Sequence, residues 1–295
     1  NTRLDVDTLT YIFEHGEAKV VLVDSQFLAP VEAAVAAMNT PKPQIIEVAD
    51  QEAGFNASGR YLEYETLLTR GDAQAPWIMP KDEWESLALN YTSGTTGRPK
   101  GVVYHHRGAY LMTMGTPISW RMTLQPVFMA IVPLFHCNGW NHTWMMPLLG
   151  GTVVGCRDIS AKAIYDGIAG EGVSHFGGAP IVLNMIVNAA DGERRSFDHQ
   201  VEVFTAGAPP APATLAAIGQ MGFNVTQVYG LTETYGHVVE SLWNPAWDAL
   251  PAEEQSSRKA RQGIAMPMMD LTTVVDDTGQ QIAMDGVTQG EIVMR

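Results

Sequence analysis

Short apolar segments alternate with longer helical segments along most of the chain, and this alternation constrains the fold more than any other feature of the sequence. The clearest stretch predicts strands over 152–155, 173–176, 201–205 and 225–229, with helices over 160–169, 181–189 and 211–221 between them. Repeated strand–helix units of this kind predict a mainly parallel sheet that is covered by helices. The expected fold class is therefore α/β.

The same alternation extends toward the N-terminus. Helices are expected over 7–13, over 30–38 and from about residue 107, and strands over 19–23, 44–48, 84–91 and 102–104. Residues 49–81 are mixed in character and are predicted to form loops. After Pro267 the pattern changes, because 271–276, a turn at 277–279 and 280–283 together predict an antiparallel β-hairpin.

The expected organisation is one incomplete α/β domain. Its two α/β parts cover about 1–85 and 86–270, and a β-rich part begins at residue 271. The chain starts at Asn1 rather than Met and stops at Arg295 within a strand-like segment. We therefore expect it to be a fragment of a longer protein.

Composition excludes several classes of function. The chain has 18 basic and 32 acidic side chains and a formal net charge of −14, so general affinity for nucleic acid or anionic membranes is not expected. Cys137 and Cys156 are the only cysteines, which excludes a disulfide framework and favours a reducing compartment such as the cytoplasm. No run of about 18 apolar residues predicts a transmembrane helix.

Residues 91–101, with the sequence Tyr-Thr-Ser-Gly-Thr-Thr-Gly-Arg-Pro-Lys-Gly, form a candidate phosphate-binding loop. Glycines let backbone N–H groups approach an anion, hydroxyl groups add donors, and Arg98 and Lys100 supply positive charge. The loop is not a Walker A motif, because Lys100 is followed by Gly101 rather than by Ser or Thr. A flexible surface turn is the alternative interpretation.

The complete string resembles the phosphate-binding signature of the adenylate-forming superfamily, which includes acyl-CoA synthetases, peptide-synthetase adenylation domains and luciferases. Two further segments match in the superfamily's order. Ala206-Gly207-Ala208-Pro209 resembles the stretch that borders adenine, and Tyr-Gly-Leu-Thr-Glu-Thr at 229–234 resembles the second signature. The resemblance covers essentially the whole chain but only the middle of a family member. It implies a partial N-terminal adenylate-forming domain whose C-terminal domain is absent.

The resemblance implies ATP, Mg²⁺ and coenzyme A as cofactor, metal and co-substrate. It implies that Tyr229 stacks on adenine, that Thr232 bonds the α-phosphate, and that Glu233 holds Mg²⁺. Packing at the pocket rim and plain solvation are the alternative roles for Tyr229 and Glu233. The catalytic residues that the resemblance implies are Lys100, His136, Thr232 and Glu233. The other nucleotide-contacting residues that it implies are Thr92, Ser93, Gly94, Thr95, Thr96, Gly97, Gly207, Ala208, Pro209 and Gly230.

On the acyl side, His136 ends a strand-like run and precedes an apolar helix expected over 140–149. A lone His beside apolar residues is commonly a core residue, but acyl-CoA synthetases resemble this chain in placing a His here, near the carboxylate. No Asp occurs over 134–138, which disfavours an α-amino acid substrate. By the same resemblance Gly177 and Gly178 are expected to line the acyl pocket, with a strand-to-helix turn as the alternative, and His237 is a candidate substrate contact.

One further stretch narrows the expected substrate. Residues 243–251, followed by Arg261-Gln262-Gly263, resemble medium-chain acyl-CoA ligases that include 3-methylmercaptopropionyl-CoA ligases. We therefore expect an acid–thiol ligase that forms an acyl-adenylate and pyrophosphate and then an acyl-CoA, with little activity in the fragment alone. A luciferase-like oxygenase or a nucleotide-binding member without ligase activity is the alternative. A homodimer is open as the assembly state.

Overall fold

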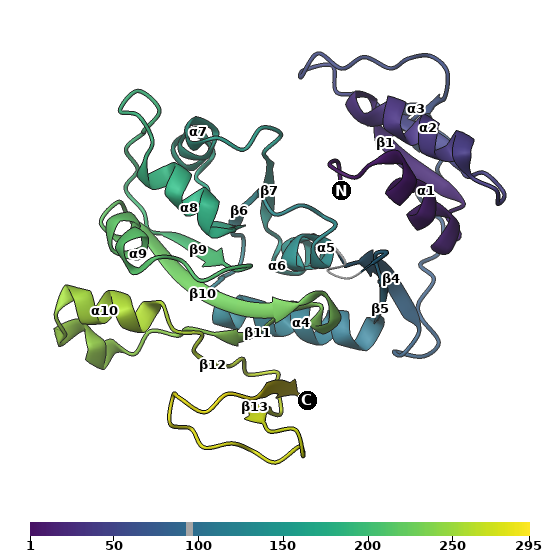
Figure 1. Ribbon diagram of the computed structural model, residues 1–295. Coiled ribbons are helices and arrows are strands. Elements are labelled where there is room, and N and C mark those ends of the chain that lie inside the picture. Colours follow the sequence, from purple (N-terminus) through teal and green to yellow (C-terminus); the bar gives the residue numbers. More distant parts are fainter. Residues whose placement is uncertain (93–96) are drawn as a thin grey trace. The chain divides into compact units, whose positions relative to one another are not determined.

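The computed structural model describes residues 1–92 and 97–295, and these form two compact units, Asn1–Val103 and Tyr104–Arg295 (Figure 1). Among the described residues, no helix is both long and apolar enough to cross a bilayer.

The first unit contains a three-stranded parallel sheet in the order β1-β2-β3 and a pair of strands, β4 and β5, that continues into the second unit. Its elements are α1 (Val6–His15), β1 (Val20–Asp24), η1 (Ser25–Phe27), α2 (Leu28–Ala37), β2 (Gln44–Val48), β3 (Leu62–Glu63), α3 (Tyr64–Leu68), β4 (Ser86–Tyr91) and β5 (Gly101–His105). The expectation of loops over 49–81 was wrong for β3 and α3. These elements are so short that neither gives a periodic signal.

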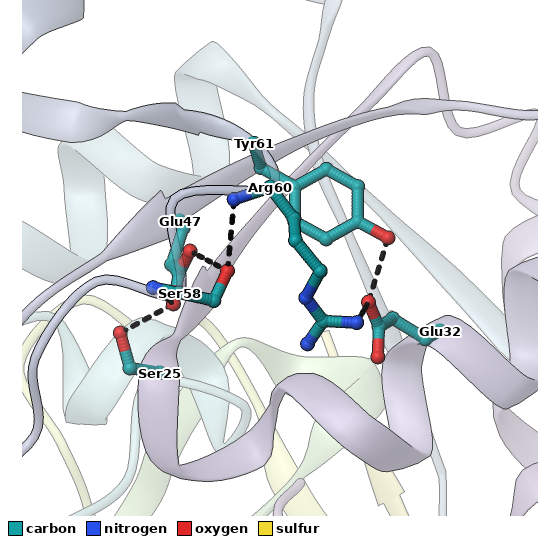
Figure 2. Close-up of polar contacts among 6 residues, drawn as sticks. All are labelled: Ser25, Glu32, Glu47, Ser58, Arg60 and Tyr61. Carbon is teal, nitrogen blue, oxygen red and sulfur yellow. Dashed lines mark hydrogen bonds and ion pairs between the residues drawn. The ribbon is translucent and has the colours of Figure 1, made fainter.

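A buried carboxylate organises the loop that leads into β3. Glu47 on β2 is 1% exposed and accepts hydrogen bonds from the Ser25 hydroxyl at 2.8 Å and from the Ser58 backbone N–H and hydroxyl at 2.9 and 2.7 Å (Figure 2). Nearby, the Tyr61 hydroxyl and the Arg60 guanidinium both contact Glu32 of α2. Burial alone would raise the pKa of Glu47, but the hydrogen bonds from Ser58 and Ser25 and the charge of Arg60 lower it on balance.

Replacing Glu47 with Gln is expected to destabilise the first unit by roughly 1.5–3 kcal/mol at neutral pH, the range for hydrogen bonds to a charged group. Because the pKa of Glu47 is lowered in the folded state, its contribution is present above the unfolded value near 4.5 and is lost as the pH falls through the folded value. Urea unfolding at several pH values measures this. The midpoints of the two proteins should differ at pH 7 and converge in acid, and a constant difference would contradict the assignment.

The second unit contains a seven-stranded sheet in the order β12-β11-β10-β9-β8-β6-β7. The strands from β10 to β7 are parallel, and β11 and β12 add antiparallel strands at one edge. Its elements are α4 (His106–Ser119), β6 (Val127–Ala130), α5 (Cys137–Trp140), α6 (His142–Leu149), β7 (Thr152–Gly155), α7 (Ala161–Glu171), β8 (His175–Gly178), α8 (Pro180–Val187), β9 (Val201–Thr205), α9 (Pro212–Gly219), β10 (Phe223–Leu231), η2 (Thr232–Thr234), β11 (Gly236–Glu240), η3 (Pro245–Ala249), α10 (Ala252–Lys259), β12 (Ile264–Ala265), β13 (Thr272–Val275) and β14 (Glu291–Met294). The expected α/β fold with a mainly parallel sheet is confirmed.

Helices cover both faces of the central strands (Figure 1), and each face packs in its own hydrophobic core. On β9, Val203 packs in the core formed with α7, α8 and α9, and the next residue, Phe204, packs in the opposite core with Trp120 and with the methionines of α6. Successive strand residues point to opposite faces, so a strand buried on both faces is apolar without alternation. This explains why the short apolar segments of the sequence predict these strands so closely.

The C-terminal end differs from the expected hairpin in its pairing. The strand that pairs with β13 is β14, and residues 280–283 add the antiparallel bridge between Val275 and Gln281 with backbone hydrogen bonds from Asp276 N–H to the Gln280 carbonyl at 2.9 Å and from Ile282 N–H to the Val274 carbonyl at 3.1 Å. The Asp285 carboxylate accepts hydrogen bonds from the backbone N–H groups of Val287 and Thr288, and this second turn sends the chain back toward β13. Antiparallel pairing is therefore present in this region, with a strand farther along the sequence.

Candidate active site

A cavity of about 360 Å³ lies at the carboxyl edge of the parallel strands in the second unit. Its wall comes from the segment after β6, from Gly178 at the end of β8, from Ala206 and Gly207 after β9, and from Gly230 on β10. β6 has β7 on one side and β8 on the other, so the strand order reverses next to β6. At such a point the loops diverge, and this is where open α/β sheets bind ligands.

The wall of the cavity is mainly apolar. Its apolar residues are Ile131, Val132, Pro133, Trp140, Ile159, Val182, Phe204, Val228 and Leu231. Its polar side chains are Thr116, His136, Cys137, Asn141, Thr232 and His237. An apolar wall with a few polar groups is typical of a small-molecule site, and the volume is near the lower end of the usual range of roughly 300–1,000 Å³. The cavity therefore suits a small, largely apolar ligand.

The structure brings several of the predicted site residues together around this cavity, namely His136, Gly178, Gly207, Gly230, Thr232 and His237. Among the described residues, the predicted ones of this unit that do not line the cavity are Gly177, Ala208, Pro209, Tyr229 and Glu233. A Cβ atom at Gly177 would lie 2.7 Å from the Trp140 ring, so the glycine allows that ring to pack against β8. Tyr229 follows Val228, which lines the cavity, and strand alternation points it the other way.

The segment that follows His136 has an unusual backbone. Five successive residues, 137–141, have positive φ angles between 45° and 69°. For residues other than glycine this left-handed conformation is costly and needs support from the surroundings. Here the turn directs Cys137, Trp140 and Asn141 into the cavity wall. It also explains why α6 begins at His142 rather than at the expected residue 140.

Tyr235, the residue after η2, supports this turn. Its hydroxyl donates to Asn138 Oδ1 at 2.9 Å and accepts from Trp144 Nε1 at 2.7 Å. Its backbone carbonyl accepts from Asn141 Nδ2 at 3.0 Å, and its ring centroid lies 4.0 Å from that of Tyr104. The second signature is therefore tied directly to the turn that carries His136.

Close backbone packing fixes the second signature itself. A Cβ atom at Gly230 would lie 1.9 Å from the carbonyl oxygen of Gly236 on β11, so only glycine fits there. The Thr234 hydroxyl accepts from the backbone N–H of Leu231 at 2.9 Å and donates to the Gly236 carbonyl at 2.7 Å. These contacts hold Thr232 at the cavity and leave Glu233 exposed.

Cys137 is a buried thiol in the cavity wall. Burial raises the pKa of Cys137 to about 11, and the negative charge of Glu233 acts in the same direction. The Tyr104 hydroxyl opposes this shift, and burial also raises the pKa of Tyr104 well above its usual value. A raised pKa keeps the thiol protonated at neutral pH, which disfavours it as a nucleophile.

Alkylation provides a test of this assignment. In a Cys156→Ser variant, iodoacetamide at pH 8 should react with Cys137 at least roughly a hundredfold more slowly in the folded protein than in urea, because the thiolate fraction falls with the raised pKa. The Cys137→Ser variant reports Cys156 as the matched measurement. Equal rates for Cys137 in the folded and unfolded protein would contradict the assignment.

The candidate phosphate-binding loop follows β4 in the first unit. Its ends pair with each other, since Thr92 N–H donates to the Lys100 carbonyl at 3.0 Å and Lys100 N–H donates to the Thr92 hydroxyl at 3.3 Å. The Arg98 guanidinium lies 5.1 Å from the centroid of the Tyr11 ring, whereas the Lys100 and Gly97 residues are exposed. The predicted contacts Ser93, Gly94, Thr95 and Thr96 lie outside the described residues.

Sequence reasoning missed several residues of the cavity wall. Trp140 and Asn141 follow His136 within the same turn, but they were assigned to a helix. Thr116 lies on α4, far from any recognised motif, and nothing in the sequence distinguishes it from the neighbouring Thr113.

Comparison with known proteins identifies the family of the chain. The family model described as "AMP-binding enzyme" matches residues 1–295. The chain is 42% identical over 308 residues to the peroxisomal acetate/butyrate–CoA ligase AAE7 of Arabidopsis thaliana, and 42% identical over 302 residues to the 2-methylpropanoate–CoA ligase CCL4 of Humulus lupulus. Each match covers 100% of this chain and 54% of the relative, so the chain spans about half the length of these curated relatives.

Solved structures share the fold at lower identity. The anthranilate CoA ligase AuaEII in complex with anthranoyl-AMP superposes with a TM-score of 0.82 at 18% identity and covers 100% of this chain and 54% of that one. The N-terminal domain of FACL13 from Mycobacterium tuberculosis gives a TM-score of 0.76 at 23% identity, over 96% of this chain and 65% of that one. These structures have the same α/β fold, with a parallel sheet flanked by helices. Because the family model matches the full length of the chain, the chain belongs to the family of AMP-binding enzymes.

Proposed function

We propose that the protein, as its gene encodes it in full, is an ATP-dependent acid–thiol ligase. In the first step a carboxylate oxygen bonds to the α-phosphorus of ATP, the bond from that phosphorus to the bridging oxygen breaks, and pyrophosphate leaves. In the second step the sulfur of coenzyme A bonds to the acyl carbon, the thiol loses its proton, and AMP leaves. Neither step needs a side chain as nucleophile.

The observation that supports this proposal best is the polarity of the cavity. Most of its buried wall is apolar, with Thr116, Asn141 and His237 as buried polar side chains, and the polar residue His136 lies on its exposed side. A carboxylic acid fits this arrangement, with its chain in the apolar part and its carboxylate near His136 and Thr232. The protein would then act by orienting the two reactants and by neutralising phosphate charge, with Lys100 as the cation that contacts the phosphates.

The proposed metal is Mg²⁺ at Glu233. Among the described residues no group of three or more His, Cys, Asp or Glu side chains could hold a metal ion. A single exposed carboxylate still fits Mg²⁺, which takes most of its ligands from water and from substrate phosphates. When bound there, the ion would neutralise negative charge on the phosphates.

The proposed substrate is a small carboxylic acid. The two relatives are named as ligases of acetate or butyrate and of 2-methylpropanoate. For this chain we still predict a medium-chain fatty acid or 3-methylmercaptopropionate, because residues 243–251 resemble ligases of those acids. The cavity of about 360 Å³ has room for a chain of several carbons. Each methylene that enters the cavity contributes about 0.8 kcal/mol, so the preference for chain length should be graded.

The test is ATP–pyrophosphate exchange with the full-length protein and a panel of fatty, branched, aryl and amino acids and 3-methylmercaptopropionate, each with and without coenzyme A. Exchange that depends on one class of acid, with a thioester formed when coenzyme A is added, is the expected result. Exchange without a thioester would move the acceptor elsewhere, and oxygen consumption would favour an oxygenase. ATP binding without any exchange would refute the ligase and favour a nucleotide-binding role.

The remaining proposals concern the setting of the protein. Two free cysteines fit a reducing compartment, and we keep the cytoplasm as the predicted one. The Arabidopsis relative is named as a peroxisomal protein. We also predict assembly as a homodimer. The molar mass of the protein in solution tests this prediction.

A further inference from the structure

Three buried polar side chains, two in the cavity wall and one behind it, have atoms without a hydrogen-bond partner among the described residues. They are Thr116 on α4 and His237 and Glu240 on β11, which are 2%, 8% and 0% exposed. The unpartnered atoms are Thr116 Oγ1, His237 Nε2 and both carboxylate oxygens of Glu240. Buried polar groups in native proteins are almost always hydrogen-bonded, so an unpartnered hydroxyl in a cavity wall can be satisfied by a bound ligand.

Two buried groups of the same type elsewhere in the chain are hydrogen-bonded, although the Ser119 hydroxyl on α4 is unpartnered like that of Thr116. The Thr113 hydroxyl, one turn earlier on α4, donates to the Ala109 carbonyl at 2.7 Å, as a helical threonine commonly does. The buried carboxylate of Glu47 accepts three hydrogen bonds (Figure 2). The hydroxyl of Thr116 and the carboxylate of Glu240 therefore differ from these two counterparts, and Thr116 also lines the cavity.

His237 stands between the cavity and Glu240. Its ring lines the cavity and contacts the Phe204 ring, with 5.0 Å between centroids, while Nε2 lies 3.5 Å from Glu240 Oε2. Glu240 itself is not part of the cavity wall. Nε2 faces the Glu240 carboxylate, so Nδ1 is the ring nitrogen that remains for a ligand in the cavity.

We propose that Thr116 and His237, with Glu240 as the positioning residue behind the histidine, bind a hydroxyl group on the acyl chain of the substrate. This inference rests on the proposed function and specifies its substrate class as a hydroxy-substituted carboxylic acid. A hydroxyl both donates and accepts, which matches a threonine hydroxyl and an imidazole nitrogen together. A plain hydrocarbon would leave both groups unpartnered, and an ammonium group would need Glu240 in the wall, where it is not.

The experiment compares butanoate, hexanoate and octanoate with their terminal hydroxy derivatives, so that the hydroxyl is moved along the cavity. The full-length protein is assayed by pyrophosphate exchange, and the dissociation constant of each acid is measured separately by calorimetry. At one chain length the hydroxy acid should have a kcat/KM at least about tenfold above that of its parent acid, because a site built to bond a hydroxyl rejects the analogue that lacks it.

Three variants and one control assign this preference to residues. Thr116→Val and His237→Phe should each reduce to about one the ratio of kcat/KM for the hydroxy acid to kcat/KM for its parent acid. Glu240→Gln should raise KM for the hydroxy acid, while kcat and the KM of the parent acid stay within about twofold of the wild type. The control is Thr113→Val, which makes the same change of hydroxyl to methyl on the same helix, at a hydroxyl that already has its partner. It should leave the ratio unchanged.

The inference is overturned if the parent acid is preferred at every length, or if the Thr116 and His237 variants retain the wild-type ratio. The first result would mean that water satisfies these groups and that the cavity takes plain chains. Preference for an amino acid of matched length would also overturn it. Absence of exchange with every acid would refute the proposed function alone, because the ratio of dissociation constants still decides this inference.

Discussion

A methyl group at position 230 should destabilise the second unit by about 3 kcal/mol or more, the upper end of the range for overpacking. The new carbon in Gly230→Ala would lie 1.9 Å from the carbonyl oxygen and 2.6 Å from the carbonyl carbon of Gly236, and 2.7 Å from the Cα of His237. All three atoms belong to the backbone of β11, so no side-chain rotation relieves the contact. β10 and β11 would have to separate where they hold the second signature.

Urea unfolding of the full-length variant measures this, with the yield of soluble protein as the readout if the variant does not fold. Gly155→Ala on β7 is the matched control, since a Cβ atom there meets nothing within 4 Å. Alanine in place of that glycine should be neutral or should stabilise the protein by roughly 0.5 kcal/mol. Equal stability of the two variants would show that the tight approach of β10 to β11 does not exist in solution.

Replacing Lys100 with Ala should reduce acid-dependent pyrophosphate exchange by about a hundredfold or more, the usual cost of losing one group that stabilises charge in a transition state. The side chain is exposed, and its backbone N–H and carbonyl, which close the loop on Thr92, are kept by the substitution. The unfolding midpoint should therefore remain that of the wild type while activity falls.

Lys81→Ala provides the control for this prediction. Lys81 is another exposed lysine of the first unit, and its loss changes the net charge by the same amount. Exchange in this variant should match the wild type. If Lys100→Ala and Lys81→Ala behave alike, the loop over 91–101 does not contact the transferred phosphates.

The elements that were predicted most accurately are those whose conformation is determined by nearby residues in the sequence. Strands 152–155 and 201–205 were predicted with the bounds that the structure has, because both are short, mainly apolar runs between turn residues, although only 201–205 is mostly buried. The helix start at Ser160 was also confirmed, since its hydroxyl accepts from the Ala163 N–H at 3.1 Å. The strand ending at His136 was predicted too long, because β6 stops at Ala130.

The sequence predicted the cavity residues that belong to the signature motifs. It did not predict the residues whose conformation or surroundings depend on tertiary contacts. Asn138, Gly139 and Asn141 indicate a turn in residues 137–141, but the left-handed Cys137 and Trp140 have no such signal in the sequence. That conformation depends on Tyr235, which lies nearly a hundred residues away. The polar interior was equally hidden, because a threonine at 116 differs from one at 113 only in what surrounds it.

The left-handed turn also gives the protein a built-in optical probe. Trp140 lines the cavity, and the Trp144 indole bonds to the hydroxyl that braces the turn. A ligand that enters the cavity must displace solvent from the Trp140 indole, so its arrival should change the tryptophan emission without any added dye. Occupancy could then be followed in real time on a stopped-flow fluorimeter, apart from the chemistry that follows it.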